Sequence, residues 1–277
     1  MHNNALAVLF AFASALTIAW GTVVRHRIAE NLGAGKSMRA VIRRPLWWAG
    51  TSTALIAYGL QAIALGFGSL LAVQPVLVLK LMLSLPMSAR FAKRRISKAQ
   101  LFWASLLTVS VGIMVIFGRP LPGQSHPSLY RWIPAIVVGL ALLSGLVYLA
   151  NHQLRSEKAV LLGIVTGGTF GYVSLFSKAT VDLFVRHGWQ GLVLNWEPYV
   201  LVATAIIGTI LQQYAFNAGS LKDSLPAMTV GEPIFAFVLG YLILGEKFTA
   251  NGIEWLFMGI ALVVMIISTF ALSRDSI

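Results

Sequence analysis

Long runs of apolar residues, separated by short polar stretches, make up most of the chain. A helix that crosses a membrane needs about 20 apolar residues, because each residue rises about 1.5 Å and the hydrocarbon core is about 30 Å thick. Nine runs approach or reach that length, at positions 4–24, 46–66, 68–88, 99–118, 131–151, 158–184, 198–217, 224–244 and 253–272. The pattern predicts an all-α, polytopic membrane protein with about nine transmembrane helices.

Composition supports this prediction. Of the 277 residues, 57% are hydrophobic and 11% are charged, whereas an ordinary soluble domain has roughly 25% charged residues. The first run is not preceded by Lys or Arg, so it lacks the positive region of a signal peptide and is predicted to stay as the first helix. The chain has no cysteine, which excludes disulfides and thiol chemistry.

The net charge of +12 indicates orientation rather than nucleic-acid binding, because the basic residues gather in alternate loops. With the amino terminus outside the cell, fifteen Lys or Arg fall in inside loops: Arg25, Arg27, Lys36, Arg39, Arg43, Arg44, Arg90, Lys93, Arg94, Arg95, Lys98, Arg155, Lys158, Lys222 and Arg274. Four fall in outside loops: Arg119, Arg131, Arg186 and Lys247. The positive-inside rule therefore predicts a multi-pass protein of the cell (inner or plasma) membrane, with the amino terminus outside and the carboxyl terminus in the cytoplasm.

The two halves of the chain resemble each other. Small residues recur every four positions in two predicted helices, 152 positions apart: Ala11, Ala15 and Ala19 in the first, and Gly163, Gly167 and Gly171 in the sixth. We assign these ladders to close helix packing. Gln74-Pro75 and Glu232-Pro233 correspond at a shift of 158. The prediction is a 4+1+4 arrangement, in which residues 1–118 form the first repeat, 119–157 an outer loop and linker helix, and 158–277 the second repeat.

Corresponding helices are five spans apart, an odd number, so the second repeat must enter the membrane from the opposite side. Inverted repeats are a common architecture of transporters, in which the halves rock around a site at the middle of the membrane. The sequence therefore favours a transporter that works by alternating access. A duplication that only built a stable bundle is the structural alternative.

Polar residues inside predicted helices locate a candidate site, because a charge at the centre of a membrane helix costs roughly 2.5 to 3.5 kcal/mol on insertion scales. Lys80 and Glu232 lie on equivalent helices of the two repeats. With neighbouring amides they form the predicted substrate-binding set: Gln61, Gln74, Lys80, Gln212, Gln213, Asn217 and Glu232. Helix breaks are predicted at Pro75, Pro226 and Pro233, because proline leaves a carbonyl without its amide partner. The alternative is that Lys80 and Glu232 form a structural ion pair or extend to different interfaces.

Other features predict structure rather than chemistry. Lys178 and Asp182 are four residues apart, so they can pair along one helix face or reach the lipid headgroups. The sequence shows no Ser-His-Asp set and no histidine cluster with metal-ligand spacing, so we expect no enzyme activity and no cofactor.

Several segments resemble a known family. They are Pro45-Leu46-Trp47-Trp48-Ala49-Gly50, Phe176-Ser177-Lys178-Ala179, the stretch 212–233 and Leu244-Gly245-Glu246-Lys247-Phe248. With the 4+1+4 pattern, they are similar to the NIPA-type magnesium transporters of the drug/metabolite transporter (DMT) superfamily, and the last segment also resembles its EamA-type members. The resemblance covers essentially the whole chain and implies passive or secondary transport of a small polar solute, with Mg²⁺ as the specific suggestion.

The residues leave the solute open. Mg²⁺ prefers oxygen ligands, often one or two carboxylates, and Glu232 is the candidate metal ligand. The first half has no acidic residue within its predicted helices, however, and Lys80 would repel the ion unless it pointed away. If Lys80 faces the cavity, an anionic or zwitterionic metabolite or a lipid-linked headgroup is favoured. A non-transporting scaffold that binds membrane lipid through its basic loops is a further alternative. We expect no nucleic-acid partner, and a homodimer is compatible with the size of the bundle.

Overall fold

The computed structural model describes residues 3–32, 45–91, 95–121, 123–124, 127–219 and 221–275. Within these ranges the chain is helical, and its one isolated β-bridge joins Leu121 to Lys247. The elements are α1 (Asn4–Leu32), α3 (Pro45–Phe67), α4 (Leu70–Val78), α5 (Lys80–Phe91), α6 (Lys98–Gly118), α7 (Leu129–Asn151), α8 (Arg155–Leu194), α9 (Glu197–Ala218), α10 (Leu221–Leu239), the π-helical turn η1 (Gly240–Leu244) and α11 (Glu254–Asp275).

The all-helical fold of a polytopic membrane protein is confirmed. Over the described ranges, eight helical spans are long and apolar enough to cross a membrane. The remaining predicted segment corresponds to α3, whose described apolar part, Ser52–Phe67, is shorter. Large apolar side chains such as Leu55, Ile116 and Val138 are exposed on the outside of the bundle. Such a surface belongs in lipid, because soluble monomers rarely expose wide apolar patches.

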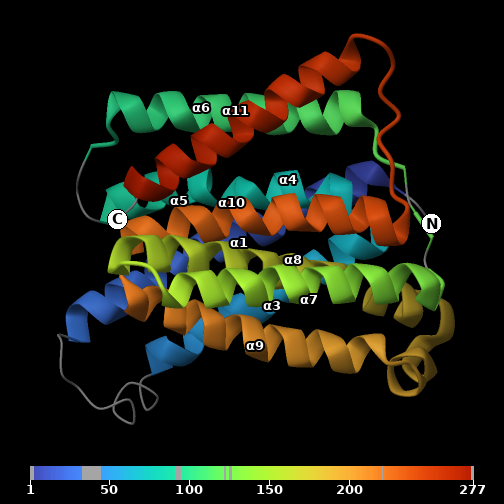
Figure 1. Cartoon of the computed structure of the whole chain (residues 1–277). Coiled ribbons are helices and arrows are strands. Elements are labelled where there is room, and N and C mark those ends of the chain that lie inside the picture. Colours follow the sequence, from blue (N-terminus) through green and yellow to red (C-terminus); the bar gives the residue numbers. More distant parts are fainter. Residues whose placement is uncertain are drawn as a thin grey trace.

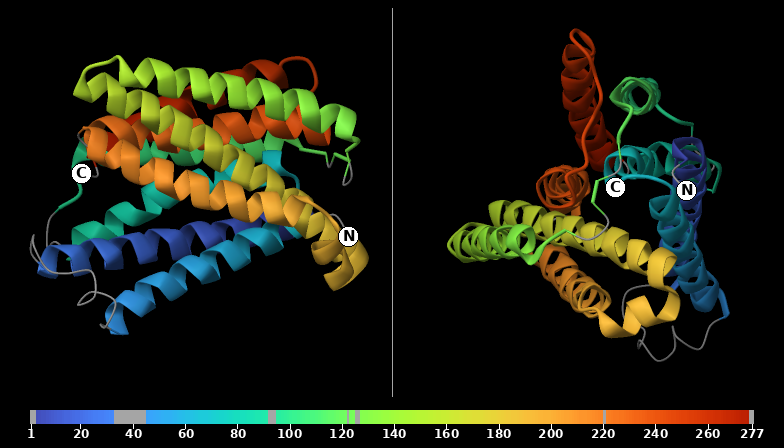
Figure 2. Two further views of the ribbon diagram at one scale, coloured as in Figure 1. Left: turned by 60° about the horizontal axis from the view of Figure 1, so that its bottom comes forward. Right: turned by 90° about the vertical axis from the view of Figure 1, so that its right-hand side faces the viewer.

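Helices α8, α4–α5 and α10 form the centre of the bundle. In the most apolar stretch of α8, 78% of the residues are buried, and in that of Leu70–Arg90, 61% are buried. In α9 the corresponding share is 11%. Helix α1 packs against α3, α4 and α5, and α8 packs against α9 and α10. Helices α6 and α11 pack together at one edge of the bundle (Figures 1 and 2). The first residues of α1 and the last residues of α3 lie at the same end, which we call the amino-terminal side.

The predicted packing role of the glycine ladder in α8 is confirmed. A Cβ atom added at Gly163 would lie 2.5 Å from the backbone oxygen of Ser224, and one added at Gly167 would lie 2.7 Å from that of Met228. The absence of side chains therefore lets α8 and α10 approach backbone to backbone. Ala11, Ala15 and Ala19 are buried in the same way in α1.

Helix irregularities differ from those predicted. Pro75 lies inside α4, and α10 continues through Pro226 and Pro233, so the helices are not interrupted at these prolines. The interruption of the third span lies at Leu79, between α4 and α5. Proline removes one amide donor, but the flanking hydrogen bonds and the packed neighbours hold the helix together.

Helix α8 is longer than the predicted 158–184. It runs from Arg155 to Leu194 with a kink at Gly188, whose φ of 59° favours glycine. The extension brings the carboxyl-terminal part of α8 to the amino-terminal side of the bundle, beyond the apolar stretch that defined the prediction.

Candidate functional site

Lys80 and Glu232 meet between the two halves of the chain. The Lys80 Nζ atom lies 3.6 Å from Glu232 Oε2, and the two side chains are 26% and 22% exposed. Lys80 is the first residue of α5, directly after the interruption at Leu79, and Glu232 is in the middle of α10. The backbone of Glu232 lies against the glycine ladder of α8, which leaves its side chain free to reach towards α5.

Both residues lie near the middle of their apolar spans. Lys80 is ten residues from either end of the span Leu70–Arg90, which corresponds to about 15 Å, or half of the hydrocarbon thickness. Glu232 is nine residues from the start of the span Asp223–Leu244. Opposite charges at such positions stabilise each other, because an unpaired charge in the middle of a membrane helix is costly.

The amides of the predicted set lie at different places. Gln74 on α4 is 1% exposed, and its Nε2 atom has no hydrogen-bond partner. Gln61 on α3 is also buried. On α9, the Gln212 amide lies 3.3 Å from the sulfur of Met228, one turn before Glu232 on α10, whereas Gln213 is exposed. Gln212 therefore contacts α10 one turn from Glu232, and Gln213 lies on the outer surface.

Asn217 lies in a surface depression at the end opposite the amino-terminal side. The hollow has a volume of about 520 Å³ and is lined by Arg155, Ser156, Asn217, Ala218, Gly219 and Asp223. All six residues belong to the second half of the chain. Asn217 is therefore at the mouth of the bundle and not beside Glu232.

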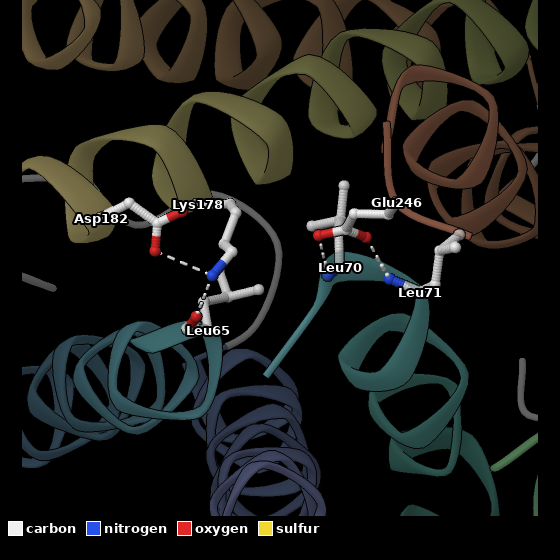
Figure 3. A network of polar contacts seen from close by, with 6 residues as sticks. All are labelled: Leu65, Leu70, Leu71, Lys178, Asp182 and Glu246. Atoms are coloured by element: carbon white, nitrogen blue, oxygen red, sulfur yellow. Dashed lines mark hydrogen bonds and ion pairs between the residues drawn. The ribbon is translucent and has the colours of Figure 1, made fainter. Parts of the chain in front are cut away.

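A second polar centre surrounds the joint between α3 and α4 on the amino-terminal side (Figure 3). The Lys178 ammonium group donates hydrogen bonds to the backbone oxygen of Leu65, at 2.7 Å, and to Asp182 Oδ1, at 2.8 Å. Lys178 is 5% exposed. The predicted pairing of Lys178 with Asp182 is confirmed, with Lys178 buried and Asp182 partly buried. Lys178 satisfies a carbonyl at the end of α3 that has no partner within the helix.

Glu246 binds the other side of the same joint. Its Oε1 atom accepts a hydrogen bond from the Leu70 amide at 2.8 Å, and its Oε2 atom accepts one from the Leu71 amide at 2.9 Å. The Ser69 hydroxyl accepts a hydrogen bond from the next amide, that of Ala72. An acidic side chain at the start of a helix and a cation at the end of one both interact favourably with the helix dipole. The second half therefore binds the end of α3 through an ammonium group and the start of α4 through a carboxyl group.

Glu246 is completely buried between the spans of α10 and α11. Burial raises the pKa of its carboxyl group from 4.5 to about 7, although the two backbone hydrogen bonds and the nearby Lys178 ammonium lower it. Desolvation disfavours the charged form more than these contacts favour it. Glu246 is thus a buried acid that changes its charge near neutral pH.

Glu246 was not among the predicted site residues, although it lies in a segment that carries the family resemblance. A glycine and an acid directly after a long apolar run, together with Ser69 at the start of another, are the sequence signals for such a contact. Their meeting depends on residues about 176 positions apart, which no local pattern connects.

Comparisons with known proteins identify a relative of full length. No protein-family model and no solved structure matches the chain. The chain is 61% identical over 281 residues to a Corynebacterium glutamicum protein named "Uncharacterized protein Cgl0250/cg0304", and the match covers 100% of this chain and 97% of that protein. Such identity over both full lengths shows common descent, and the chain therefore belongs to the family of this Corynebacterium glutamicum protein.

Proposed function

We propose that the protein is a membrane transporter of a small polar solute, and that it works by alternating access around Lys80 and Glu232. The observation that carries the proposal is the contact of these two charges, 3.6 Å apart, at the middle depth of two central helices. Transporters commonly bind their solutes at this depth, between repeats. In this proposal the chain forms a 4+1+4 inverted repeat of the DMT type, with the amino terminus outside.

The helix contacts support the inverted repeat. The contacts of α1 with α3 and with α4–α5 correspond to those of α8 with α9 and with α10. Two pairs of equivalent helices also touch across the bundle, α4 with α10 and α6 with α11. A twofold axis in the membrane plane would produce both the matching pairs and the contacts between equivalents.

The charges favour a small organic solute that carries both signs over Mg²⁺. Lys80 points at Glu232 and would repel a divalent cation bound there. The part of the chain that the structure describes holds no group of three His, Cys, Asp or Glu residues placed to bind a metal ion. A zwitterion could instead replace the internal pair, with its anionic group on Lys80 and its cationic group on Glu232. Mg²⁺ transport remains the alternative to test.

The test is solute entry into proteoliposomes. One set is loaded with a magnesium-sensitive dye, and a second receives small isotope-labelled zwitterions. The wild-type protein is compared with Lys80→Met and Glu232→Gln, each of which removes one charge at similar volume. Glu197→Gln is the matched control, because it removes another buried carboxylate on the amino-terminal side, away from the pair. Uptake that is lost in both site variants and kept in the control would support the proposal and identify the solute class.

A scaffold makes a different prediction for a cysteine at Gln74. This side chain is 1% exposed, so a thiol there reacts with a water-soluble reagent only if the bundle opens. Asn217 is exposed already, and a thiol there would react in either case. A Gln74→Cys protein that never reacts, together with no uptake of either kind of solute, would refute transport.

A further inference from the structure

At the α3–α4 joint, hydrogen bonds from two side chains of the second half hold the backbone of the first half. The last turn of α3 and the first turn of α4 leave backbone groups without helical partners, and no water is available in lipid to satisfy them. Lys178 donates a hydrogen bond to the Leu65 oxygen, and Glu246 accepts hydrogen bonds from the Leu70 and Leu71 amides. Both charged residues come from the second half. Separating the halves at this side would break all three hydrogen bonds.

Further contacts close the same side. The Thr249 amide donates to the Gly118 oxygen at 3.0 Å, and Leu121 and Lys247 form a β-bridge. The Leu70 side chain lies against Gly240, where an added Cβ would be 3.5 Å from its Cδ2 atom. The structure is thus a form in which the amino-terminal side is closed and Glu246 is removed from water.

We propose that Glu246 is a proton-binding site coupled to this joint: its carboxylate takes up a proton from water when the joint closes around it, and releases that proton to water when the joint opens. The inference rests on the proposed alternating access. In this inference, the form with the amino-terminal side closed binds one more proton than the form with that side open.

The direction follows from burial. A carboxylate in water ionises near its ordinary pKa, whereas enclosing it in protein favours the neutral form. The pKa of Glu246 in the closed joint is about 7, against 4.5 in water. Linkage then requires that deprotonation favours the open form, because that form binds fewer protons at the same pH. Between pH 5 and pH 8 these two values correspond to a change of about 70-fold in the ratio of open to closed molecules.

The charged groups around Glu246 do not cancel this effect. From α8, the Lys178 ammonium lowers its pKa and the Asp182 carboxylate raises it, and these two groups are paired with each other. From α7, Arg131 lies beside Gly245, where an added Cβ would be 3.2 Å from the guanidinium Nη1 atom. The next residue, Lys247, is exposed, and the first turn of α4 has no acidic residue.

The experiment uses a single cysteine at Leu70 in this cysteine-free chain. The Leu70 side chain is fully buried against the other half, so its thiol reports opening of the joint. The labelling rate with a water-soluble maleimide is measured in proteoliposomes from pH 5 to pH 8. It is divided at each pH by the rate for Asn251→Cys, an exposed position, which removes the pH dependence of the thiol itself.

We expect the normalised labelling rate to rise about 70-fold from pH 5 to pH 8 in Leu70→Cys. The rise should disappear in Leu70→Cys with Glu246→Gln, because glutamine does not ionise, and should persist with the matched control Glu197→Gln. A rate that does not change with pH in Leu70→Cys, or a rise that persists without Glu246, would overturn the proton site.

Hydrogen exchange provides a second measurement without a cysteine. The Leu70 and Leu71 amides, bound by Glu246 in the closed joint, should exchange faster at pH 8 than at pH 5 after correction for the intrinsic rate. Equal corrected rates would overturn the inference even if Leu70→Cys does not fold. Neither readout involves a solute, so a pH response without transport refutes the proposed function alone, and transport without a pH response refutes the proton site alone.

Discussion

Replacing Lys178 with methionine should destabilise the protein more than any loss of surface charge. Lys178 is 5% exposed, and its ammonium group makes two hydrogen bonds, to the Leu65 oxygen and to Asp182. Methionine has a similar length and no charge. The substitution therefore removes the contacts while disturbing the packing of α8 very little.

The expected cost follows from the groups that remain. Asp182, 14% exposed in its side chain, would keep a buried charge without a partner, and breaking such a pair costs about 3–5 kcal/mol. The Leu65 oxygen would also lose its partner, at about 1–3 kcal/mol. The double variant Lys178→Met with Asp182→Leu leaves only the orphan carbonyl. We therefore expect a loss of about 6 kcal/mol for the single variant and about 2 kcal/mol for the double.

The assay is reversible unfolding of the purified protein in mixed micelles with increasing sodium dodecyl sulfate. The fluorescence of the eight tryptophans reports the transition. Lys247→Met is the control, because its side chain is exposed and its removal should change the free energy of unfolding by less than about 0.5 kcal/mol. A Lys178→Met protein as stable as this control would refute the assigned role of the cation. So would a double variant less stable than the single one.

Four further variants test the packing and the buried acid. Gly167→Ala should lower the free energy of unfolding by about 1–3 kcal/mol, because the new methyl group would meet the Met228 oxygen. Gly112→Ala, a helical position with nothing within 4 Å, should be neutral or stabilising by up to about 1 kcal/mol. Gly245→Ala should cost about 1 kcal/mol or more, because φ is 67° there. Because burial raises the pKa of Glu246 to about 7, its contribution is most favourable below pH 4.5 and is lost as the pH rises to 7, by about 3 kcal/mol. Glu246→Gln should remove that slope from unfolding measured between pH 5 and pH 8, and an unchanged slope would show that another group titrates.

The candidate site was predictable in part. Lys80 and Glu232 are conspicuous because charges are rare inside apolar runs, and their places on equivalent helices of the two halves predicted that they could face each other. The structure confirms the contact. Asn217 and Gln213 follow the same logic of polar residues in apolar runs, yet both are exposed. A polar residue near a helix end can lie at the surface without cost, so its sequence position alone does not place it in a site.

Periodicity and length by themselves determined the helical class and most helix positions of this protein. Runs of about 20 apolar residues have one stable state in lipid, since every backbone group must be bonded within the segment. Small residues at four-residue spacing determined where α8 could be approached closely. Both conclusions depend only on local chemistry.

Only the tertiary structure decided how the α3–α4 joint is satisfied. The amides of Leu70 and Leu71 needed acceptors wherever the chain folded, but that Glu246 supplies them depends on α10 ending in a π-turn beside α4. The interruption at Leu79, and not at a proline, was likewise seen only in the structure. These features join residues that are distant in the chain, and their energies depend on burial, which a linear pattern does not contain.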